Sequence, residues 1–341
     1  MSDRATREAE SRANHARYRG QPEGFYESYF QRANPPTRPL AFWIRYTLFS
    51  PAGRPGDARG ELWAIVFDGE SGRHHVAKQE LPFSERCAFA SDRLAVTVGD
   101  ARLEPGRLTG AAGDGADRIT WDLTWQGGGS PLFLLPLGLY DARLPRAKSL
   151  VGAPGCAYRG SIRAGDREIP IDGWVGSQNH NWGTRHTDRY AWGQVAGFDG
   201  AEDSFLEVAT ARLRFGPAWT PPITPLVLRH RGEEIALRSI HQALRADAAV
   251  EGFSFRFRAS AAGIELEGHL SAPPADFVGL RYENPPGGDK HCLNTKIAAC
   301  ELTLRRRTLG RIVSVETLRA PRRAAFEILT DDRDHGIPIR A

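Results

Sequence analysis

The strongest restriction on the fold is a period-two alternation of apolar and polar residues that returns along most of the chain. Between residues 42 and 48, and again at 119–125 and 253–257, every second side chain is apolar. Successive side chains of a β-strand point to opposite faces of a sheet, so this alternation predicts strands with one buried face. Long helical patterns between these segments are missing, which argues against parallel βαβ units. We therefore predict an all-β fold with antiparallel sheets.

Other segments with a strand-like pattern are spaced regularly along the chain. Turn segments that contain glycine separate them, as at residues 110–115, 230–232 and 261–263. The expected strands lie near residues 41–49, 60–67, 92–104, 117–126, 157–164, 168–175, 190–198, 204–214, 224–230, 234–239, 251–259, 262–270, 294–305, 311–318 and 324–329. About fifteen short strands are too many for one small barrel and fit two barrels of about eight strands each. The length of 341 residues also favours two domains.

The expected organisation is an N-terminal arm followed by two β domains. Residues 1–30 form the arm, and the composition of residues 4–17, rich in Ala, Arg and Glu, predicts a short helix there. Residues 31–172 form the first domain and residues 173–341 the second. No low-complexity linker marks the division, so we expect the two domains to pack closely.

Charge and the N-terminal sequence restrict the partners and the compartment. The chain has 45 basic and 41 acidic residues and a net charge of +4, which is too small an excess to predict nucleic-acid binding. The first twenty residues lack the apolar core of a secretory signal, and no apolar run approaches the ~20 residues of a membrane span. Four scattered cysteines without a CxxC pair are typical of reduced thiols. We expect a cytoplasmic protein; peripheral membrane contact and oligomeric state stay open.

The most unusual composition lies between residues 173 and 186, where two tryptophans, two histidines and two asparagines are crowded together. Asn, His and Gln are poor strand formers, so a strand that carries them needs a reason. In an extended segment Gln178, His180 and Trp182 share one face, while Asn179 and Asn181 share the other. One face would then offer a titratable imidazole beside a large aromatic ring.

This segment resembles a family signature. The run Gly-Trp-x-Gly-x-Gln-Asn-His-Asn-Trp-Gly at residues 173–183, followed by Tyr190-x-Trp192, is similar to that of the AttH and carotenoid 1,2-hydratase (hydroxyneurosporene synthase) superfamily. Weaker similarity continues at residues 42–44, 282–285 and 291–295. The resemblance implies two lipocalin-like, calycin-type domains with a hydrophobic ligand site near their interface. Members differ widely in activity, so the fold does not fix the reaction.

The resemblance also implies roles for individual residues. In the carotenoid hydratases the His and Trp of this motif act with a downstream Tyr and Asp on an isoprenoid double bond, and His180 and Trp182 match the first pair. The downstream pair is not matched cleanly. Tyr190, Asp199 and Glu207 are the nearby candidates, and their spacing does not choose among them.

Hydration or cyclisation of an alkene needs a protected acid, aromatic rings that stabilise a carbocation, and a positioned base. Glu207 or Asp199 could supply the acid and His180 the base or an orienting partner. Rings and further ligand contacts come from the remaining candidates, which are Trp182, Tyr190, Trp192, Trp174, Gln178 and Asn179. The competing interpretation is structural: His180 bonds backbone carbonyls where the domains meet, the tryptophans pack in the core, and the amides bond the backbone.

No metal or cofactor is expected. His180 and His186 are six residues apart, and the chain has no HExxH motif, Cys/His cluster, phosphate loop or nucleophile elbow. Two functions therefore stay open: a cofactor-independent hydratase, cyclase or isomerase acting on a hydrophobic, isoprenoid-like small molecule, and a carrier that shelters such a ligand without chemistry. A carboxylate within reach of His180 would favour the enzyme.

Overall fold

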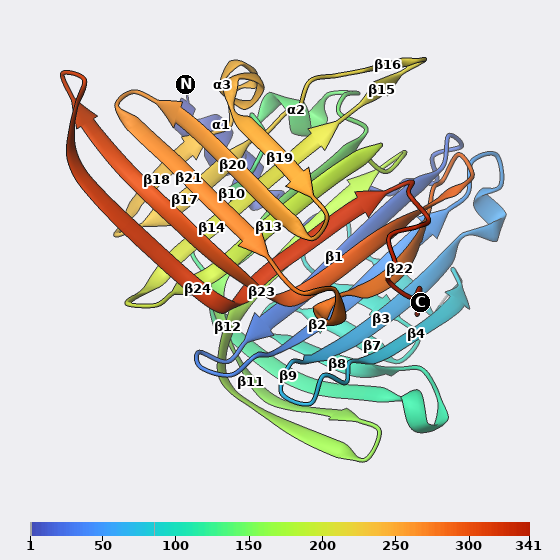
Figure 1. The fold of residues 1–341 in the computed structure, drawn as a ribbon. Helices are drawn as coiled ribbons and strands as arrows, with labels where there is room; N and C mark the ends of the chain where they lie inside the picture. Colours follow the sequence, from blue (N-terminus) through green and yellow to red (C-terminus); the bar gives the residue numbers. More distant parts are fainter. Residues whose placement is uncertain (1, 85) are drawn as a thin grey trace.

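The computed structural model describes residues 2–84 and 86–341 and consists almost entirely of antiparallel strands (Figure 1). Helix is limited to α1 (Ser2–Ser11), α2 (Gly138–Asp141), α3 (Ile240–Arg245) and the 3-10 turns η1 (Pro55–Asp57), η2 (Gly115–Asp117) and η3 (Pro274–Asp276). The predictions of an all-β fold and of a short N-terminal helix are confirmed. Among the described residues, no helix has the length and apolar character needed to cross a membrane.

The first sheet has 12 strands and curls around one hydrophobic core. In spatial order its strands are β4 (His75–Pro82), β3 (Arg59–Asp68), β2 (Leu40–Ser50), β1 (Phe25–Asn34), β12 (Arg167–Gly183), β11 (Ala147–Ala164), β9 (Ile119–Gly127), β8 (Arg107–Ala112), β7 (Ala101–Glu104), β6 (Val96–Val98) and β5 (Cys87–Phe89), with β10 (Leu132–Phe133) paired to β11. Ala77 of β4 and Cys87 of β5, at opposite ends of this order, belong to the same core. The sheet is therefore a nearly closed barrel.

The second sheet has 10 strands and its own core. Its order is β18 (Glu233–Leu237), β17 (Leu226–His230), β14 (Ala201–Arg212), β13 (Arg189–Phe198), β24 (Arg311–Thr330), β23 (Asp289–Thr308), β21 (Ile264–Ser271), β20 (Ser254–Ala261) and β19 (Asp247–Glu251), with β22 (Val278–Glu283) paired to β23. A separate hairpin joins β15 (Arg214–Phe215) and β16 (Ala218–Trp219). In β9 and β20 the alternating apolar residues face the two cores, as predicted from their periodicity.

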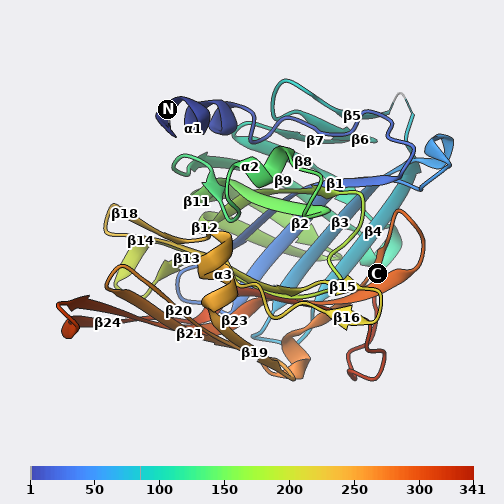
Figure 2. The same cartoon turned by 90° about the horizontal axis from the view of Figure 1, so that it is seen from above.

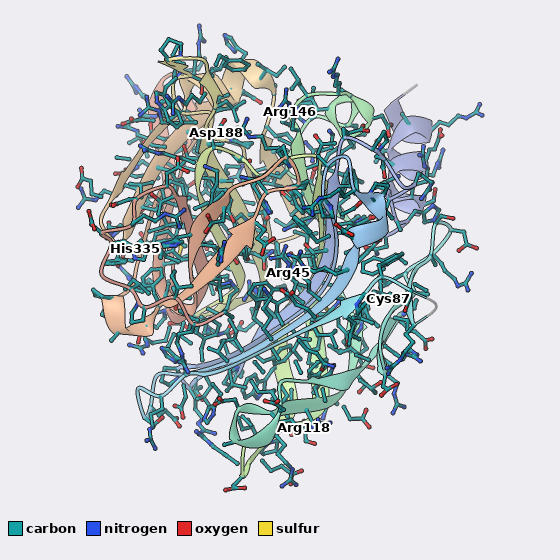
Figure 3. All side chains as sticks on the ribbon, turned by 90° about the vertical axis from the view of Figure 1, so that its right-hand side faces the viewer. Arg45, Cys87, Arg118, Arg146, Asp188 and His335 are labelled. Atoms are coloured by element: carbon teal, nitrogen blue, oxygen red, sulfur yellow. The ribbon has the colours of Figure 1, made fainter. Side chains whose placement is uncertain are left out.

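A third apolar cluster joins the outer face of the barrel to the second sheet. Phe30, Trp43 and Trp63 from β1 to β3 pack with Trp192 of β13 and Leu280 of β22. Arg45 of β2 marks this interface in Figure 3. Because the central strands of the barrel are covered on both faces, every residue of β1 and β2 is buried. This cluster is consistent with the expectation that the two halves of the chain pack closely.

The chain crosses from one sheet to the other at residues 184–188, between β12 and β13. The division expected at residues 172 and 173 lies inside β12, which belongs entirely to the first sheet. The first strand begins at Phe25, inside the range expected for the arm. Ahead of β1, helix α1 and the segment 12–24 lie against one end of the barrel (Figure 2), where Ala13 packs with Phe25 and Trp182. We call residues 12–18 the N-terminal cap.

Candidate functional site

Strand β12 lies between the barrel interior and the second sheet, and its two faces carry different chemistry. His180 pairs with Tyr29 of β1 and faces the barrel interior with it. Asn179 faces the other way and bonds Gln194 of the second sheet. The alternation of faces expected from the sequence is thus present, and it divides the candidate residues into two clusters on opposite sides of one strand.

The first cluster surrounds His180, whose side chain is completely buried. Its Nδ1 atom lies 2.8 Å from the backbone oxygen of Ala13 in the N-terminal cap. Its Nε2 atom lies 2.8 Å from Oε1 of Glu27, which is also completely buried. The ring stacks on Tyr29 with 4.1 Å between centroids and lies 4.6 Å from the Trp182 ring. We call Glu27, Tyr29, His180 and Trp182 the capped cluster.

The hydrogen-bond partners of His180 and Glu27 show which of their atoms donate and which accept. A backbone carbonyl oxygen only accepts, so Nδ1 of His180 carries a proton that it donates to Ala13. Glu27 accepts the backbone N–H groups of Arg17 at 2.7 Å and Tyr18 at 2.9 Å. The pair therefore places an imidazole N–H and a carboxyl group side by side at a completely buried position.

The N-terminal cap closes this cluster. Besides its backbone contacts to His180 and Glu27, it places the Arg17 guanidinium 5.1 Å from the Trp182 ring centre. Four side-chain atoms in or close to the cap are buried without a hydrogen-bond partner: Asn14 Oδ1, Arg17 Nε, Gln178 Oε1 and Gln31 Nε2. Gln31 and Gln178 are partners across β1 and β12, and a Cβ added at Gly152 would meet both Gln178 Oε1 and Asn14 Oδ1. Unpaired buried polar atoms mark a place where a bound molecule can supply the missing partner.

The second cluster lies between the two sheets and centres on Glu207 of β14. Its Oε1 accepts from Trp192 Nε1 at 2.7 Å, and its Oε2 accepts from Gln194 Nε2 at 2.8 Å. Gln194 also donates to Asn179 Oδ1 at 2.8 Å, while its oxygen accepts from the fully buried Arg32 at 2.7 Å. Burial raises the pKa of Glu207 to about 7, against the opposing effect of its two donors and of Arg32.

This pKa predicts a pH dependence of stability. Between pH 4.5 and about 7 the unfolded state loses the Glu207 proton while the folded state keeps it, so stability falls as pH rises through this range. The loss of unfolding free energy from this group amounts to about 3 kcal/mol at most and is complete only above pH 7. Urea denaturation at pH 5 and pH 8 checks this with Glu207→Gln, which should gain stability relative to the unmodified protein at pH 8. An equal difference at both pH values would contradict it.

A buried ion pair adjoins the second cluster. Lys296 Nζ lies 2.8 Å from Glu327 Oε1 and between the rings of Trp43 and Trp192, at 5.7 and 5.3 Å from their centres. Tyr190 donates to Glu327 Oε2 at 3.2 Å, and burial raises the pKa of its hydroxyl well above the ordinary value. Burial lowers the pKa of Lys296, while Glu327 opposes this shift.

The structure separates the remaining candidates. Asp199 lies in the β13–β14 turn, where its side chain is 56% exposed and paired with Arg323. Trp174 belongs to the barrel core and stacks near Phe42. Neither residue meets His180 or Glu207. The structure thus joins His180 with Trp182, places Gln178 beside the cap, and groups Trp192, Asn179 and Glu207 separately with Tyr190 nearby.

Several residues in and beside these clusters were not anticipated: Glu27, Tyr29, Arg32, Gln194, Lys296 and Glu327. Glu27 falls within the range expected for the arm, yet it is the carboxylate within reach of His180. The available signal was the aromatic enrichment of residues 25–30, Phe-Tyr-Glu-Ser-Tyr-Phe, which is typical of a strand even without alternation. Lys296 and Glu327 are 31 residues apart in the sequence and come together because β23 and β24 pair with Asn294 opposite Glu327.

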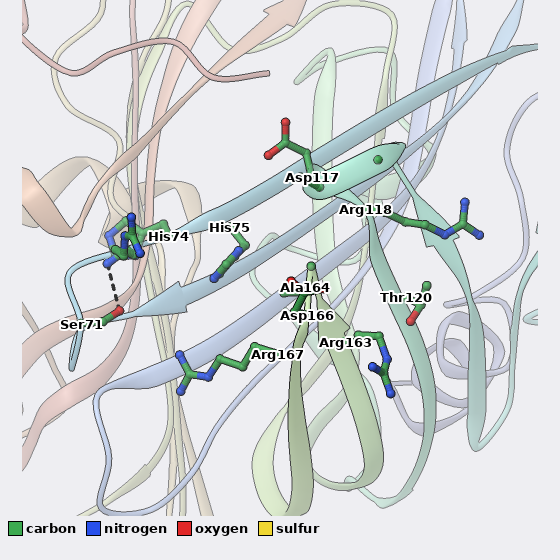
Figure 4. Close-up of a pocket in the computed structure, with 14 residues that line it drawn as sticks. Ser71, His74, His75, Asp117, Arg118, Thr120, Arg163, Ala164, Asp166 and Arg167 are labelled. Carbon is green, nitrogen blue, oxygen red and sulfur yellow. Dashed lines mark hydrogen bonds between the residues drawn. The ribbon is translucent and has the colours of Figure 1, made fainter.

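A hollow of about 870 Å³ lies away from both clusters (Figure 4). It is formed by the β3–β4, β8–β9 and β11–β12 connections and is lined by polar side chains that include His75, Arg118 and Arg167. Most of its lining residues are charged or polar. Across residues 2–84 and 86–341, no group of three or more His, Cys, Asp or Glu side chains is placed to hold a metal ion.

Comparison with known proteins gives the fold a precedent. No protein-family model and no curated sequence matches the chain. Among solved structures, an AttH-type protein from Nitrosomonas europaea superposes with a TM-score of 0.56 at 13% identity, covering 90% of this chain and 91% of the other. The chain has the AttH fold. The fold implied by the resemblance at residues 173–183 is confirmed, as is the lipocalin-like, all-β architecture.

Two further structures share the AttH fold over nearly the whole chain. Kievitone hydratase from Nectria haematococca matches with a TM-score of 0.56 at 10% identity, over 89% of each chain. CghA, solved with Sch210972, matches with a TM-score of 0.55 at 13% identity, over 90% of this chain and 89% of the other. At such identities the likeness extends to the fold alone, so any activity must be argued from the residues of this chain.

Proposed function

We propose that this protein is a cofactor-independent enzyme that hydrates, cyclises or isomerises a hydrophobic small molecule at a carbon–carbon double bond. The observation that carries the proposal is the completely buried His180–Glu27 pair, with its two ring nitrogens on Ala13 and Glu27 and aromatic rings beside it. A purely structural histidine needs no buried carboxylate, and burying one is costly unless it is paired.

The roles follow from the geometry. Glu27 holds Nε2 and balances the charge of the ring, as a carboxylate does behind a catalytic histidine. Nδ1, which bonds Ala13 in the closed protein, is the atom that meets the substrate once the cap moves. Its proton adds to one alkene carbon, and the π electrons form the new C–H bond. The adjacent carbon becomes a cation beside Tyr29 and Trp182, whose ring faces stabilise positive charge.

The cation has three outcomes that conserve atoms and charge. Water adds to it and returns a proton to His180, which completes hydration. An internal double bond attacks it and loses a proton to His180, which completes cyclisation. Loss of a neighbouring proton alone completes isomerisation. In each case His180 recovers its proton, so no cofactor is consumed.

Substrate access requires displacement of the N-terminal cap, because His180 has no exposed surface while Ala13 covers it. Lids that close over a reaction also exclude water from it. The unpaired atoms of Gln31, Gln178 and Asn14 offer a donor and two acceptors to a polar group of the substrate. These features support a ligand that is mostly apolar and carries a hydroxyl or carbonyl group. The hydratase among the structures with the same fold is consistent with this chemistry.

The proposal is tested by conversion. The protein is incubated with a lipid extract of its source cells, and compounds are compared by chromatography and mass spectrometry with those left by Glu27→Gln and His180→Gln. We expect a substrate to decline and a product that is isomeric or heavier by one water to appear only with the unmodified protein. Asp172→Asn, on the exposed end of the same strand, is the matched control and should convert normally. Binding of a ligand that every form releases unchanged would identify a carrier instead.

A further inference from the structure

The hairpin formed by β23 and β24 carries an apolar tip that no part of the described chain covers. Both strands have 20 residues, and their connecting turn projects at the edge of the molecule in Figures 1 and 2. Leu309 at the turn is 98% exposed, and Val313 and Val315 are 60% and 58% exposed. Ile312, next to Val313, is 49% exposed. Exposed apolar side chains gathered at one place mark a contact surface.

The turn itself is unfavourable for leucine. Leu309 has a φ of 48° and Gly310 a φ of 78°, so both residues of the two-residue connection are left-handed. Such turns favour Asn-Gly, because a branched apolar side chain gains nothing in this conformation and strains the backbone. Leu309 therefore costs stability twice, through its backbone conformation and through its exposure to water. Neither folding nor solubility accounts for a leucine here.

Arginines surround the apolar tip. Arg305 and Arg306 pair with glutamates of neighbouring strands, Glu267 at 2.7 Å and Glu233 at 2.5 Å. Arg307 shares Glu265 with Arg305 and lies 3.5 Å from its carboxylate oxygen. Arg311, next to the turn, has no ion pair within the described part of the chain. The tip thus combines apolar side chains with the unpaired positive charge of Arg311 directly behind them.

We propose that this hairpin tip docks the protein on an anionic lipid bilayer. Leu309 and Val313 enter the boundary between headgroups and acyl chains, while Arg307 and Arg311 remain at the phosphate level. A protein partner would need an apolar groove shaped for the tip, whereas a bilayer accepts any exposed apolar side chain. The proposal does not depend on the proposed function, although a membrane is where a hydrophobic substrate would gather.

Sedimentation with lipid vesicles tests the proposal. We expect the protein to bind phosphatidylglycerol vesicles at least tenfold more tightly than phosphatidylcholine vesicles. The double variant Leu309→Asn, Val313→Ser should lose at least tenfold in affinity for the anionic vesicles. Leu309→Asn alone should unfold at the same or a higher urea concentration, because asparagine suits the turn, so weaker binding cannot reflect misfolding.

Phe215→Ser is the matched control, because Phe215 is 61% exposed on a different hairpin and should leave binding unchanged. Equal binding to both kinds of vesicle, or no binding to either, would overturn the proposal. A dimer seen by light scattering that the double variant abolishes would also overturn it, by showing that the tip contacts a second copy of the chain.

Discussion

Replacing Glu27 with alanine should lower the free energy of unfolding by about 3–5 kcal/mol, the range seen when one partner of a buried ionic pair is removed. The variant leaves His180 without its carboxylate and leaves the backbone N–H groups of Arg17 and Tyr18 without an acceptor. Since these bonds fasten the N-terminal cap, the loss should also free the cap from the barrel. Urea denaturation followed by tryptophan fluorescence measures both effects, because Trp182 lies beneath the cap.

The variant Glu27→Gln removes the negative charge of the carboxylate but keeps a side chain of nearly the same size, so it separates the two contributions. Its amide oxygen can still accept one backbone N–H, so it should retain more of the stability than alanine does. It cannot carry the negative charge that balances a protonated His180, so conversion should be lost as fully as with alanine. Full conversion by a stable Glu27→Gln variant would show that the carboxylate only fastens the cap.

Replacing Lys296 with methionine should also cost about 3–5 kcal/mol of unfolding free energy, since Glu327 then stays buried without its cation. The ammonium group is completely buried and bonds Asn294 Oδ1 at 2.5 Å as well as Glu327 at 2.8 Å. The double variant Lys296→Met, Glu327→Gln removes both charges and should recover most of the loss. Urea denaturation of the two variants measures the difference.

The same variants show which of the two clusters hosts the proposed reaction. Lys296 and Glu327 lie on the opposite side of β12 from His180, so the stable double variant should keep converting substrate. If it folds with near-normal stability and loses all conversion, the reaction takes place between the sheets, near Glu207 and Tyr190, and the assignment to the capped cluster is wrong.

Much of the fold could be predicted because one-sided burial leaves a period-two pattern in the sequence. β9 and β20 show it clearly. β1 could not be found in this way, since the second sheet covers its outer face and every residue of FYESYFQRAN is buried. A strand buried on both faces need not alternate, although β2, which is also buried throughout, does so between residues 42 and 48. For the same reason the N-terminal arm was expected to extend to residue 30, whereas the strand begins at Phe25.

The candidate site could be predicted in part. The motif at residues 173–183 identified His180 and Trp182, and strand geometry separated Gln178 from Asn179. The partner of His180 could not be predicted, because Glu27 reaches it only through the pairing of β1 with β12. Asp199 shows the converse: it is near the motif in sequence, but the β13–β14 turn carries it to the surface. Short sequence separation did not imply contact, and long separation did not exclude it.

We propose above that His180, supported by Glu27, delivers a proton to carbon. Running the conversion experiment in deuterium oxide tests it most directly, because the proton on His180 then exchanges for deuterium before it is transferred. We expect a product with one deuterium bound to carbon, formed by the unmodified protein and absent with Glu27→Gln and His180→Gln. A product without carbon-bound deuterium, or an unchanged ligand released by all three proteins, would contradict it.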